Sequence, residues 1–148
     1  MPPIHIHCEP PSHGWLTLQL RVGDRCIEID ASDVPNNPVQ DLADALDLAA
    51  RGLRGQVWWN LEPDGYFMSF EPVGDALRFQ LDFAPCSERR SATTVLAFQG
   101  ARSETLLPFW RFLRAFQSRA YAASDWPAVN YERLPAIKTN LDAGKLEQ

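Results

Sequence analysis

Apolar and polar residues alternate between Gln56 and Phe83, and two groups of turn residues divide this region into three stretches. Such alternation places every second side chain on the same face of a β-strand. Pro63-Asp64-Gly65 and Gly74-Asp75 supply the proline, aspartate and glycine that tight turns favour. The region therefore predicts three antiparallel strands. The residues expected on their inner face are Val57, Trp59, Leu61, Tyr66, Met68, Phe70, Leu77, Phe79, Leu81 and Phe83.

The opposite face of these three strands is mixed. It carries two aromatic residues, Trp58 and Phe67, among the polar residues Asn60, Ser69, Glu71, Arg78, Gln80 and Asp82. Aromatic side chains anchor many protein interfaces, so a binding surface is one interpretation. The other interpretation is that a helix or a terminal segment covers this face, because scattered apolar residues are ordinary on globular proteins.

Further strands are predicted on both sides of this region. Alternation over Gly14–Val22, the turn at Gly23-Asp24 and the return over Cys26–Asp30 predict a hairpin. Its expected inner residues are Leu16, Leu18, Leu20, Val22, Ile27 and Ile29. Ile4–Cys8 predicts a short edge strand, and residues 92–99 predict another strand that Gly100 ends.

Helical spacing of apolar residues predicts a first helix between the hairpin and the central strands. Asn36 or Asn37 is placed to cap it, Pro38 suits its first turn, and Gly52 or Gly55 ends it. Its apolar stripe consists of Val39, Leu42, Leu46, Ala49 and Leu53. Three aspartates lie off this stripe and are interpreted as a solvated face: Asp41, Asp44 and Asp47. Asp47 is spaced to pair with Arg51.

A second helix is predicted after Gly100, with Ser103 or Thr105 as its cap and Pro108 in its opening turn. Its apolar stripe consists of Leu106, Phe109, Leu113, Phe116 and Ala120, and its basic side of Arg111, Arg114 and Arg119. A short third helix is expected over Pro135–Leu141.

This order of elements predicts the α+β class, with a single antiparallel sheet of about five to six strands and helices packed on one face. We expect one domain over residues 1–148, in which residues 1–13 form a proline-rich arm and residues 142–148 fray.

The distribution of charge along the chain indicates what kind of partner the protein could bind. Residues 1–84 hold five arginines and no lysine against thirteen acidic residues, a net charge of −8, whereas residues 85–148 have a net charge of +3. An acidic surface repels phosphate and so argues against nucleic acid as the partner. It suits a basic protein partner, and the alternative is that the charge serves only solubility.

Targeting and redox features are few. No apolar run reaches the length of about 18–20 residues that spans a bilayer, and the first residues lack the pattern of a secretory signal. We therefore expect a cytoplasmic protein that does not bind membranes. Three cysteines without paired spacing, Cys8, Cys26 and Cys86, favour reduced thiols.

Candidate chemistry is limited to the histidines. His5 and His7 would share one face of a strand, and His13 is close enough in sequence to fold back as a third metal ligand. An exposed terminal site of this kind lacks supporting contacts, so we predict neither a metal nor a cofactor. No nucleophile elbow, phosphate-binding loop or metalloprotease motif is present, and we predict no catalytic residue.

Three segments carry a resemblance to a group of small uncharacterised bacterial proteins. These are Gly23-Asp24, Ser32-Asp33-Val34-Pro35-Asn36, and Trp59-Asn60-Leu61-Glu62-Pro63-Asp64-Gly65-Tyr66. The group has a W-x-x-E-P-G-x-Y-like meander between two helices, and here Asp64 departs from the pattern by preceding the glycine. Small acidic α+β proteins of this kind resemble immunity proteins of bacterial toxin systems. The resemblance implies a protein that neutralises a cognate toxin by binding it.

The leading hypothesis is therefore a protein-binding module with an acidic surface and aromatic anchors. The candidate partner-binding residues are Asp41, Asp44, Asp47, Trp58, Glu62, Asp64, Phe67 and Glu71. One alternative is a small metal-assisted enzyme that uses His5, His7 and His13. Another is a structural or regulatory subunit that forms a homodimer through an open sheet edge.

Overall fold

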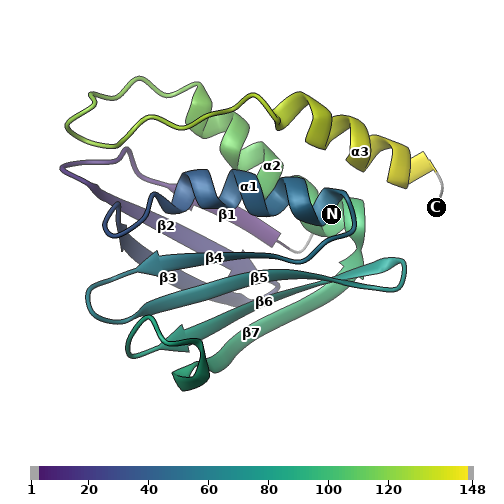
Figure 1. Cartoon of the computed structure of the whole chain (residues 1–148), viewed down its shortest axis with the longest axis horizontal. Helices are drawn as coiled ribbons and strands as arrows, with labels where there is room; N and C mark the ends of the chain where they lie inside the picture. Colours follow the sequence, from purple (N-terminus) through teal and green to yellow (C-terminus); the bar gives the residue numbers. More distant parts are fainter. Residues whose placement is uncertain (1–3, 147–148) are drawn as a thin grey trace.

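The computed structural model describes residues 4–146, with side chains up to Ala143, and it contains two antiparallel sheets (Figure 1). Sheet A has the strand order β1 (Ile4–Cys8), β2 (Trp15–Val22), β3 (Arg25–Ser32). Sheet B has the order β4 (Gly55–Asn60), β5 (Gly65–Val73), β6 (Ala76–Ala84), β7 (Thr93–Ala101).

Three α-helices lie on one side of sheet B: α1 (Pro38–Ala50), α2 (Arg102–Gln117) and α3 (Leu134–Leu146). α1 packs on β4 and β5, and α3 packs on α1 and α2. α2 contacts β1 of sheet A as well as β6 and β7 of sheet B, so it joins the two sheets. Among the described residues, no helix is long and apolar enough to cross a membrane.

The predicted α+β class is confirmed, and the predicted edge strand Ile4–Cys8 lies at the edge of sheet A. The single sheet of five to six strands is wrong, because seven strands divide between two sheets. Strands β3 and β4 approach each other without pairing, since the chain between them forms α1. The alternation of side chains identifies strands but does not say which strands pair.

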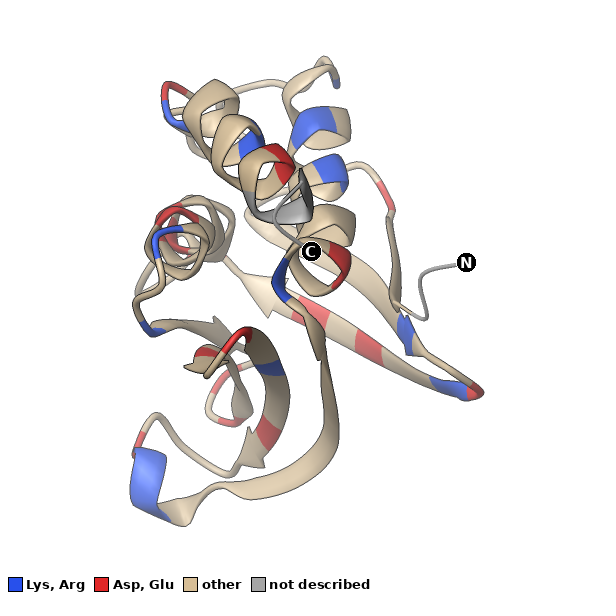
Figure 2. Cartoon of the chain, turned by 90° about the vertical axis from the view of Figure 1, so that its right-hand side faces the viewer, with Lys and Arg blue, Asp and Glu red and all other residues tan. Residues whose placement is uncertain are grey.

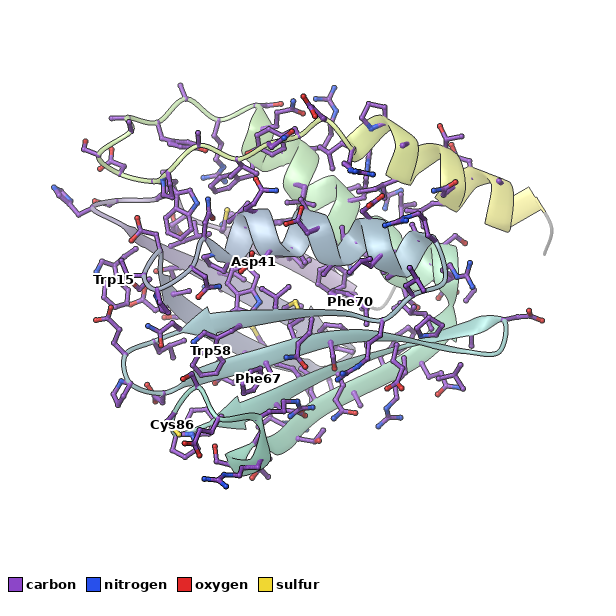
Figure 3. All side chains as sticks on the ribbon, viewed as in Figure 1. Trp15, Asp41, Trp58, Phe67, Phe70 and Cys86 are labelled. Carbon is purple, nitrogen blue, oxygen red and sulfur yellow. The ribbon has the colours of Figure 1, made fainter. Side chains whose placement is uncertain are left out.

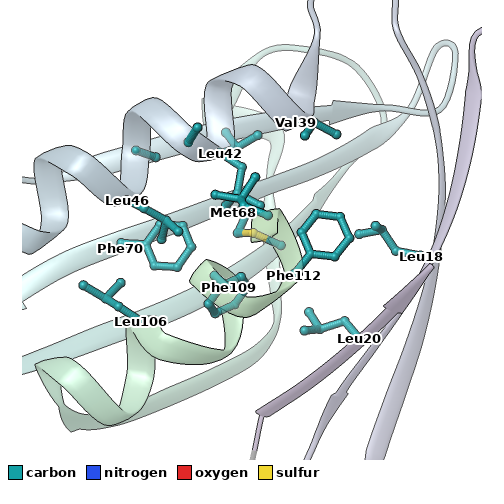
Figure 4. Close-up of a cluster of buried hydrophobic side chains, with 14 of the residues drawn as sticks. Leu18, Leu20, Val39, Leu42, Leu46, Met68, Phe70, Leu106, Phe109 and Phe112 are labelled. Carbon is teal, nitrogen blue, oxygen red and sulfur yellow. The ribbon is translucent and has the colours of Figure 1, made fainter. Parts of the chain in front are cut away.

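The core lies where the two sheets and the helices meet (Figure 4). Leu18 and Leu20 from sheet A face Met68 of sheet B and Phe112 of α2. A cluster of three rings, Phe70, Phe79 and Phe109, has centroid separations of 5.0–5.6 Å. Most predicted inner residues are buried, and those that are half-buried are Val22, Ile27, Leu61, Tyr66 and Phe83.

The boundaries of α1 follow the sequence. The Asn37 side chain accepts hydrogen bonds from the backbone N–H groups of Val39 and Gln40. Gly52, with φ of 83°, ends the helix in a Schellman motif, because Leu53 N–H reaches the carbonyl of Leu48. Leu53 therefore lies beyond the helix with 51% of its surface exposed, and its expected place in the apolar stripe is wrong.

The start of α2 differs from the prediction. Pairing of β7 with β6 continues to Ala101, so Gly100 lies inside the strand and the helix begins at Arg102 without a side-chain cap. The expected caps Ser103 and Thr105 are buried within the first turns.

Pro108 is the seventh residue of α2 rather than part of its opening turn, and it lacks the N–H that would bond to the preceding turn. The helix ends at Gln117, so Ala120 falls outside it and is exposed. At the other end of the chain, α3 continues to Leu146 instead of ending at Leu141. The expected fraying of residues 142–148 stays a prediction, and residues 147–148 lie outside the described part.

Candidate interaction surface

Trp58 and Phe67 form a stacked pair on the outer face of sheet B (Figure 3). They are cross-strand partners on β4 and β5, their ring centroids lie 4.6 Å apart, and the planes are inclined by 43°. The Trp58 ring also lies over Gly65, where an added Cβ would come within 2.6 Å of the ring. Trp58 is half-buried, while Phe67 exposes only 5% of its surface.

The connection between β6 and β7 covers Phe67. It contains the short 3-10 helix η1 (Arg89–Ser91), and the Arg89 guanidinium lies 5.2 Å from the centre of the Phe67 ring. The interpretation that a helix or a terminal segment covers this face is therefore wrong for Phe67, because a loop covers that residue, and Glu71 on the same face is exposed. Of the two aromatic candidates, Trp58 presents more of its ring to solvent.

Asp82 anchors this covering loop. It is the cross-strand partner of Phe67, only 1% exposed, and its carboxylate pairs with Arg89. Gln80 Nε2 donates to both carboxylate oxygens, at 2.9 and 3.2 Å. Asp82 occupies the outer face as predicted, yet it is buried. The sequence gives no signal for Arg89, because its position depends on how the loop folds back.

The three aspartates of α1 point in different directions. Steps of three residues rotate the side chain by about 60° around a helix, so Asp41, Asp44 and Asp47 spread over a wide arc. Asp47 is 7% exposed and pairs with Arg51 at 3.1 Å, as predicted, and with Arg133 at 3.5 Å. Its interpretation as part of a solvated face is wrong, because Arg133, which precedes α3, also covers it.

Asp41 lies beside the edge strand of sheet B. The Asn36 Nδ2 atom donates to Asp41 Oδ2 at 2.7 Å and to the carbonyl oxygen of Trp58 at 3.0 Å. Asn60 Nδ2 likewise donates to the carbonyl of Val34 at 2.7 Å. The loop before α1 therefore holds the edge of β4, and Asn36 links Asp41 to the backbone of Trp58; both residues are labelled in Figure 3.

Glu62 and Asp64 lie in the turn that joins β4 to β5. Glu62 is exposed, with φ of 64°, a backbone region that favours glycine and asparagine. Burial, and then the charge of Asp64, raise the pKa of the Tyr66 hydroxyl. Glu71 lies toward the other end of β5, opposite Arg78. The structure thus groups Trp58 with the turn, places Asp41 on α1 next to the loop that holds β4, and separates Glu71 from them.

Five of the candidate carboxylates form no ion pair within the described part of the chain. They are Asp41, Asp44, Glu62, Asp64 and Glu71. The two buried carboxylates of this region, Asp47 and Asp82, both have arginine partners. Acidic positions occur on α1 and on both sheets, whereas basic positions recur on α2 (Figure 2). The negative charge near Trp58 is therefore left for solvent or for a partner.

The histidines do not assemble a metal site. His5 and His7 are exposed on the same face of β1, as predicted, and His7 lies 4.0 Å from Glu9. His13 sits in a turn, where its ring bonds to Ser12 Oγ at 2.9 Å. Among residues 4–143, no three His, Cys, Asp or Glu side chains are close enough to hold a metal ion.

Ser12, His13 and Asp125 come together on the surface without the geometry of a catalytic triad. The Asp125 carboxylate accepts a hydrogen bond from the backbone N–H of His13, at 3.1 Å. In a triad the carboxylate would instead orient the imidazole. All three cysteines are free thiols, with Cys8 buried, Cys26 exposed and Cys86 half-buried.

Comparisons with known proteins give one distant structural likeness. No family model matches the sequence, and no curated protein matches it. The structure is similar to a chain of a solved structure described as a "CdiA-CT/CdiI toxin and immunity complex from Enterobacter cloacae". The two chains are 10% identical with a TM-score of 0.45, and the match covers 78% of this chain and 99% of the other. A likeness at this level does not bear on function.

Proposed function

We propose that this protein is a protein-binding module whose acidic surface, formed by Asp41, Trp58, Glu62 and Asp64, binds a basic protein. We further propose that the partner is a bacterial toxin, which the protein neutralises by direct binding in the cytoplasm. The toxin is suggested by the resemblance of the sequence to small acidic immunity proteins, and not by the geometry of the site.

The observation that carries the proposal is that Asp41, Glu62 and Asp64 form no ion pair within the described residues, while the half-buried Trp58 lies beside the turn that holds two of them. The protein pairs Asp47 and Asp82 with its own arginines but leaves Asp41, Glu62 and Asp64 without one. Unpaired carboxylates attract a basic surface over several ångströms, and an aromatic ring supplies apolar contact area at the centre.

The test is capture of a partner from a lysate of the source organism, at low and high salt, by three forms of the protein. One form is unaltered, and the second carries Asp41→Asn, Glu62→Gln and Asp64→Asn. The third is a control with the same change in charge at exposed positions elsewhere, namely Asp24→Asn, Glu28→Gln and Asp75→Asn.

We expect one stoichiometric, basic partner that the unaltered protein and the control retain at low salt and release at high salt. The first triple variant should lose it. Equal capture by both triple variants would exclude this surface. If the captured protein stops growth of a bacterial host when expressed alone, and coexpression restores growth, the immunity function is supported. A captured partner without toxicity would contradict that part.

Strand β7, one of the two edges of sheet B, favours a second candidate function, self-association. Strand β7 ends the sheet, and residues 93–101 contain neither a charged residue nor a proline. Natural edge strands usually carry such residues, because an unprotected edge pairs with other chains. The absence of charged residues and proline from β7 supports a homodimer, which the sequence analysis gave as an alternative.

Sedimentation velocity over a range of concentrations tests this candidate. The unaltered protein should form a dimer as its concentration rises. Ala97→Lys, a charge placed at an exposed position of β7, should keep it monomeric, whereas Gln19→Lys on sheet A should not. A protein that remains monomeric at every concentration would remove this candidate.

A further inference from the structure

A groove of about 400 Å³ runs along the edge of sheet A, where strand β1 and helix α2 contact each other. One wall is the whole of strand β1, Ile4–Cys8. The other wall and the floor come from one side of α2, at positions three or four residues apart. The helix positions are Pro108, Arg111, Phe112, Ala115 and Phe116, and Arg119 lies two residues past the end of α2.

The two walls are similar in length. A strand rises about 3.3 Å per residue, so the five residues of β1 span about 16 Å. A helix rises 1.5 Å per residue, so the part of α2 from Pro108 to its end at Gln117 spans about 14 Å, and Arg119 lies beyond that end. A groove of this length accommodates about five residues of extended chain.

The backbone of β1 offers hydrogen-bonding groups to this groove. In an antiparallel strand, alternate residues direct both backbone groups toward the same neighbouring strand. Glu9 N–H donates to Thr17 on β2, so His7 and His5 also turn toward β2. The backbone groups of Ile4, Ile6 and Cys8 therefore point away from sheet A. The Cys8 carbonyl confirms this direction, because it accepts a hydrogen bond from Arg119 Nη2 at 2.8 Å.

The side chains that line the groove favour a negatively charged ligand. Arg111 is exposed and makes no hydrogen bond or ion pair within the described residues, and Arg119 is half-buried. Phe112 and Phe116 form an apolar floor, and Ala115 leaves space between the arginines. The nearest carboxylate in the sequence is Glu9, which lies 4.0 Å from His7. Within the described part of the chain, no Asp or Glu lines the groove itself.

We propose that this groove binds an extended acidic segment of a partner protein. The segment adds a fourth strand to sheet A by pairing with the outward backbone groups of Ile4 and Ile6. Its carboxylates lie against Arg111 and Arg119. Main-chain pairing supplies affinity in this mode of recognition, and the side chains supply selectivity. The inference does not rest on the acidic surface around Trp58, which has the opposite charge and lies on sheet B.

The test uses a capped peptide of alternating glutamate and valine, about six residues long, with a lysine–valine peptide as the reversed-charge control. Binding to the ¹⁵N-labelled full chain is followed by NMR at low salt. The acidic peptide should shift the amide signals of β1 and α2 and slow hydrogen exchange at Ile4 and Ile6. The lysine–valine peptide should not bind.

Two pairs of variants separate groove binding from general attraction. Arg111→Glu should weaken binding at least about tenfold, while Arg114→Glu, an exposed position of α2 that does not line the groove, should have little effect. Ala115→Trp should block the groove without changing charge, while Gln117→Trp on the same helix should not. Circular dichroism checks that each variant folds.

Three results would overturn the proposal. The first is no binding of the acidic peptide at millimolar concentration. The second is equal weakening by Arg111→Glu and Arg114→Glu, which indicates unspecific attraction. The third is a concentration-dependent dimer that Ala115→Trp abolishes, since a second copy of this chain would then occupy the groove.

Discussion

Sheets A and B bury their inner faces in the same core, but their outer faces differ in how far they are exposed to solvent. Sheet A leaves its outer side chains in water, including His5, His7, Gln19, Arg21 and Glu28. Sheet B buries Phe67, Ser69 and Asp82 on the corresponding face. Alternation in the sequence therefore predicts the burial of both faces of sheet A but only that of the inner face of sheet B. On the outer face of sheet B, a later part of the chain folds back over the strands.

Arg89 accounts for much of this difference. It lies over the Phe67 ring and pairs with the buried carboxylate of Asp82, so one side chain covers an apolar group and compensates a charge. Sheet A has no aromatic residue in the middle of its outer face, and its outer Thr17–Asp30 hydrogen bond is exposed to solvent. An exposed polar face is stable in water without a covering segment.

The largest expected effect comes from removing this arginine. Arg89→Met should lower the free energy of unfolding by about 3 kcal/mol, because the buried Asp82 carboxylate loses its ion pair. The matched change on sheet A, Arg21→Met, affects an exposed side chain and should stay within about 0.5 kcal/mol. Denaturation in urea measures both. Equal effects would show that the covering loop does not stabilise sheet B.

The glycines of the two sheets provide the second comparison. Gly65→Ala places a Cβ 2.3 Å from the carbonyl oxygen of Trp59 and against the ring of Trp58, and should cost about 2 kcal/mol. Gly23→Ala meets no atom within 4 Å, and should cost about 1 kcal/mol through its φ of 61°. Only Gly65→Ala should change tryptophan fluorescence. The same change in Gly23→Ala would contradict this assignment.

A smaller effect is expected at strand β4, the edge of sheet B that the loop before α1 covers. Asn36→Ala removes the hydrogen bonds to Asp41 and to the carbonyl of Trp58, and should cost about 1 kcal/mol. Thr17→Val breaks the exposed hydrogen bond to Asp30 on sheet A and should cost less than about 0.5 kcal/mol. Thermal unfolding of both variants measures the difference. A larger loss for Thr17→Val would reverse the comparison.

The smallest effect concerns alkaline pH. The pKa of Tyr66 is raised above its ordinary value of 10.0 by burial and then by the charge of Asp64. As pH rises past 10, the unfolded chain loses this proton before the folded protein does, so stability falls. Asp64→Asn should move the Tyr66 titration to lower pH, measured by ultraviolet absorbance against Tyr66→Phe. Asp75→Asn, in another turn, should leave it unchanged; an equal displacement would exclude the local charge as its cause.

Much of the local structure follows from neighbouring residues in the sequence. The inner faces of the hairpin and of the three central strands were predicted, and so were an asparagine cap and a glycine end for α1, because each depends on residues a few positions apart. The start of α2 was not, because the pairing of Ala101 with Ala76 extends β7 past Gly100. The helix therefore begins at Arg102, directly after the strand and before either predicted cap.

The candidate site was predicted only in part. The sequence identified Trp58 and the carboxylates of the β4–β5 turn, which lie on the outer face and at the tip as expected. It did not identify the burial of Phe67, which depends on Arg89, or that of Asp47, which also pairs with Arg133. Hydrophobic alternation assigns a side chain to a face but does not show what covers that face.

The sequence by itself determined the α+β class, the inner faces of the strands, the boundaries of α1 and the excess of acidic charge in the first 84 residues. The tertiary structure alone decided that the strands form two sheets, that Asp82 is buried, and that β1 and α2 enclose a groove. The first group depends on side-chain periodicity and capping within a few residues. The second depends on contacts between distant segments, such as Arg119 with Cys8, for which local sequence patterns carry no signal.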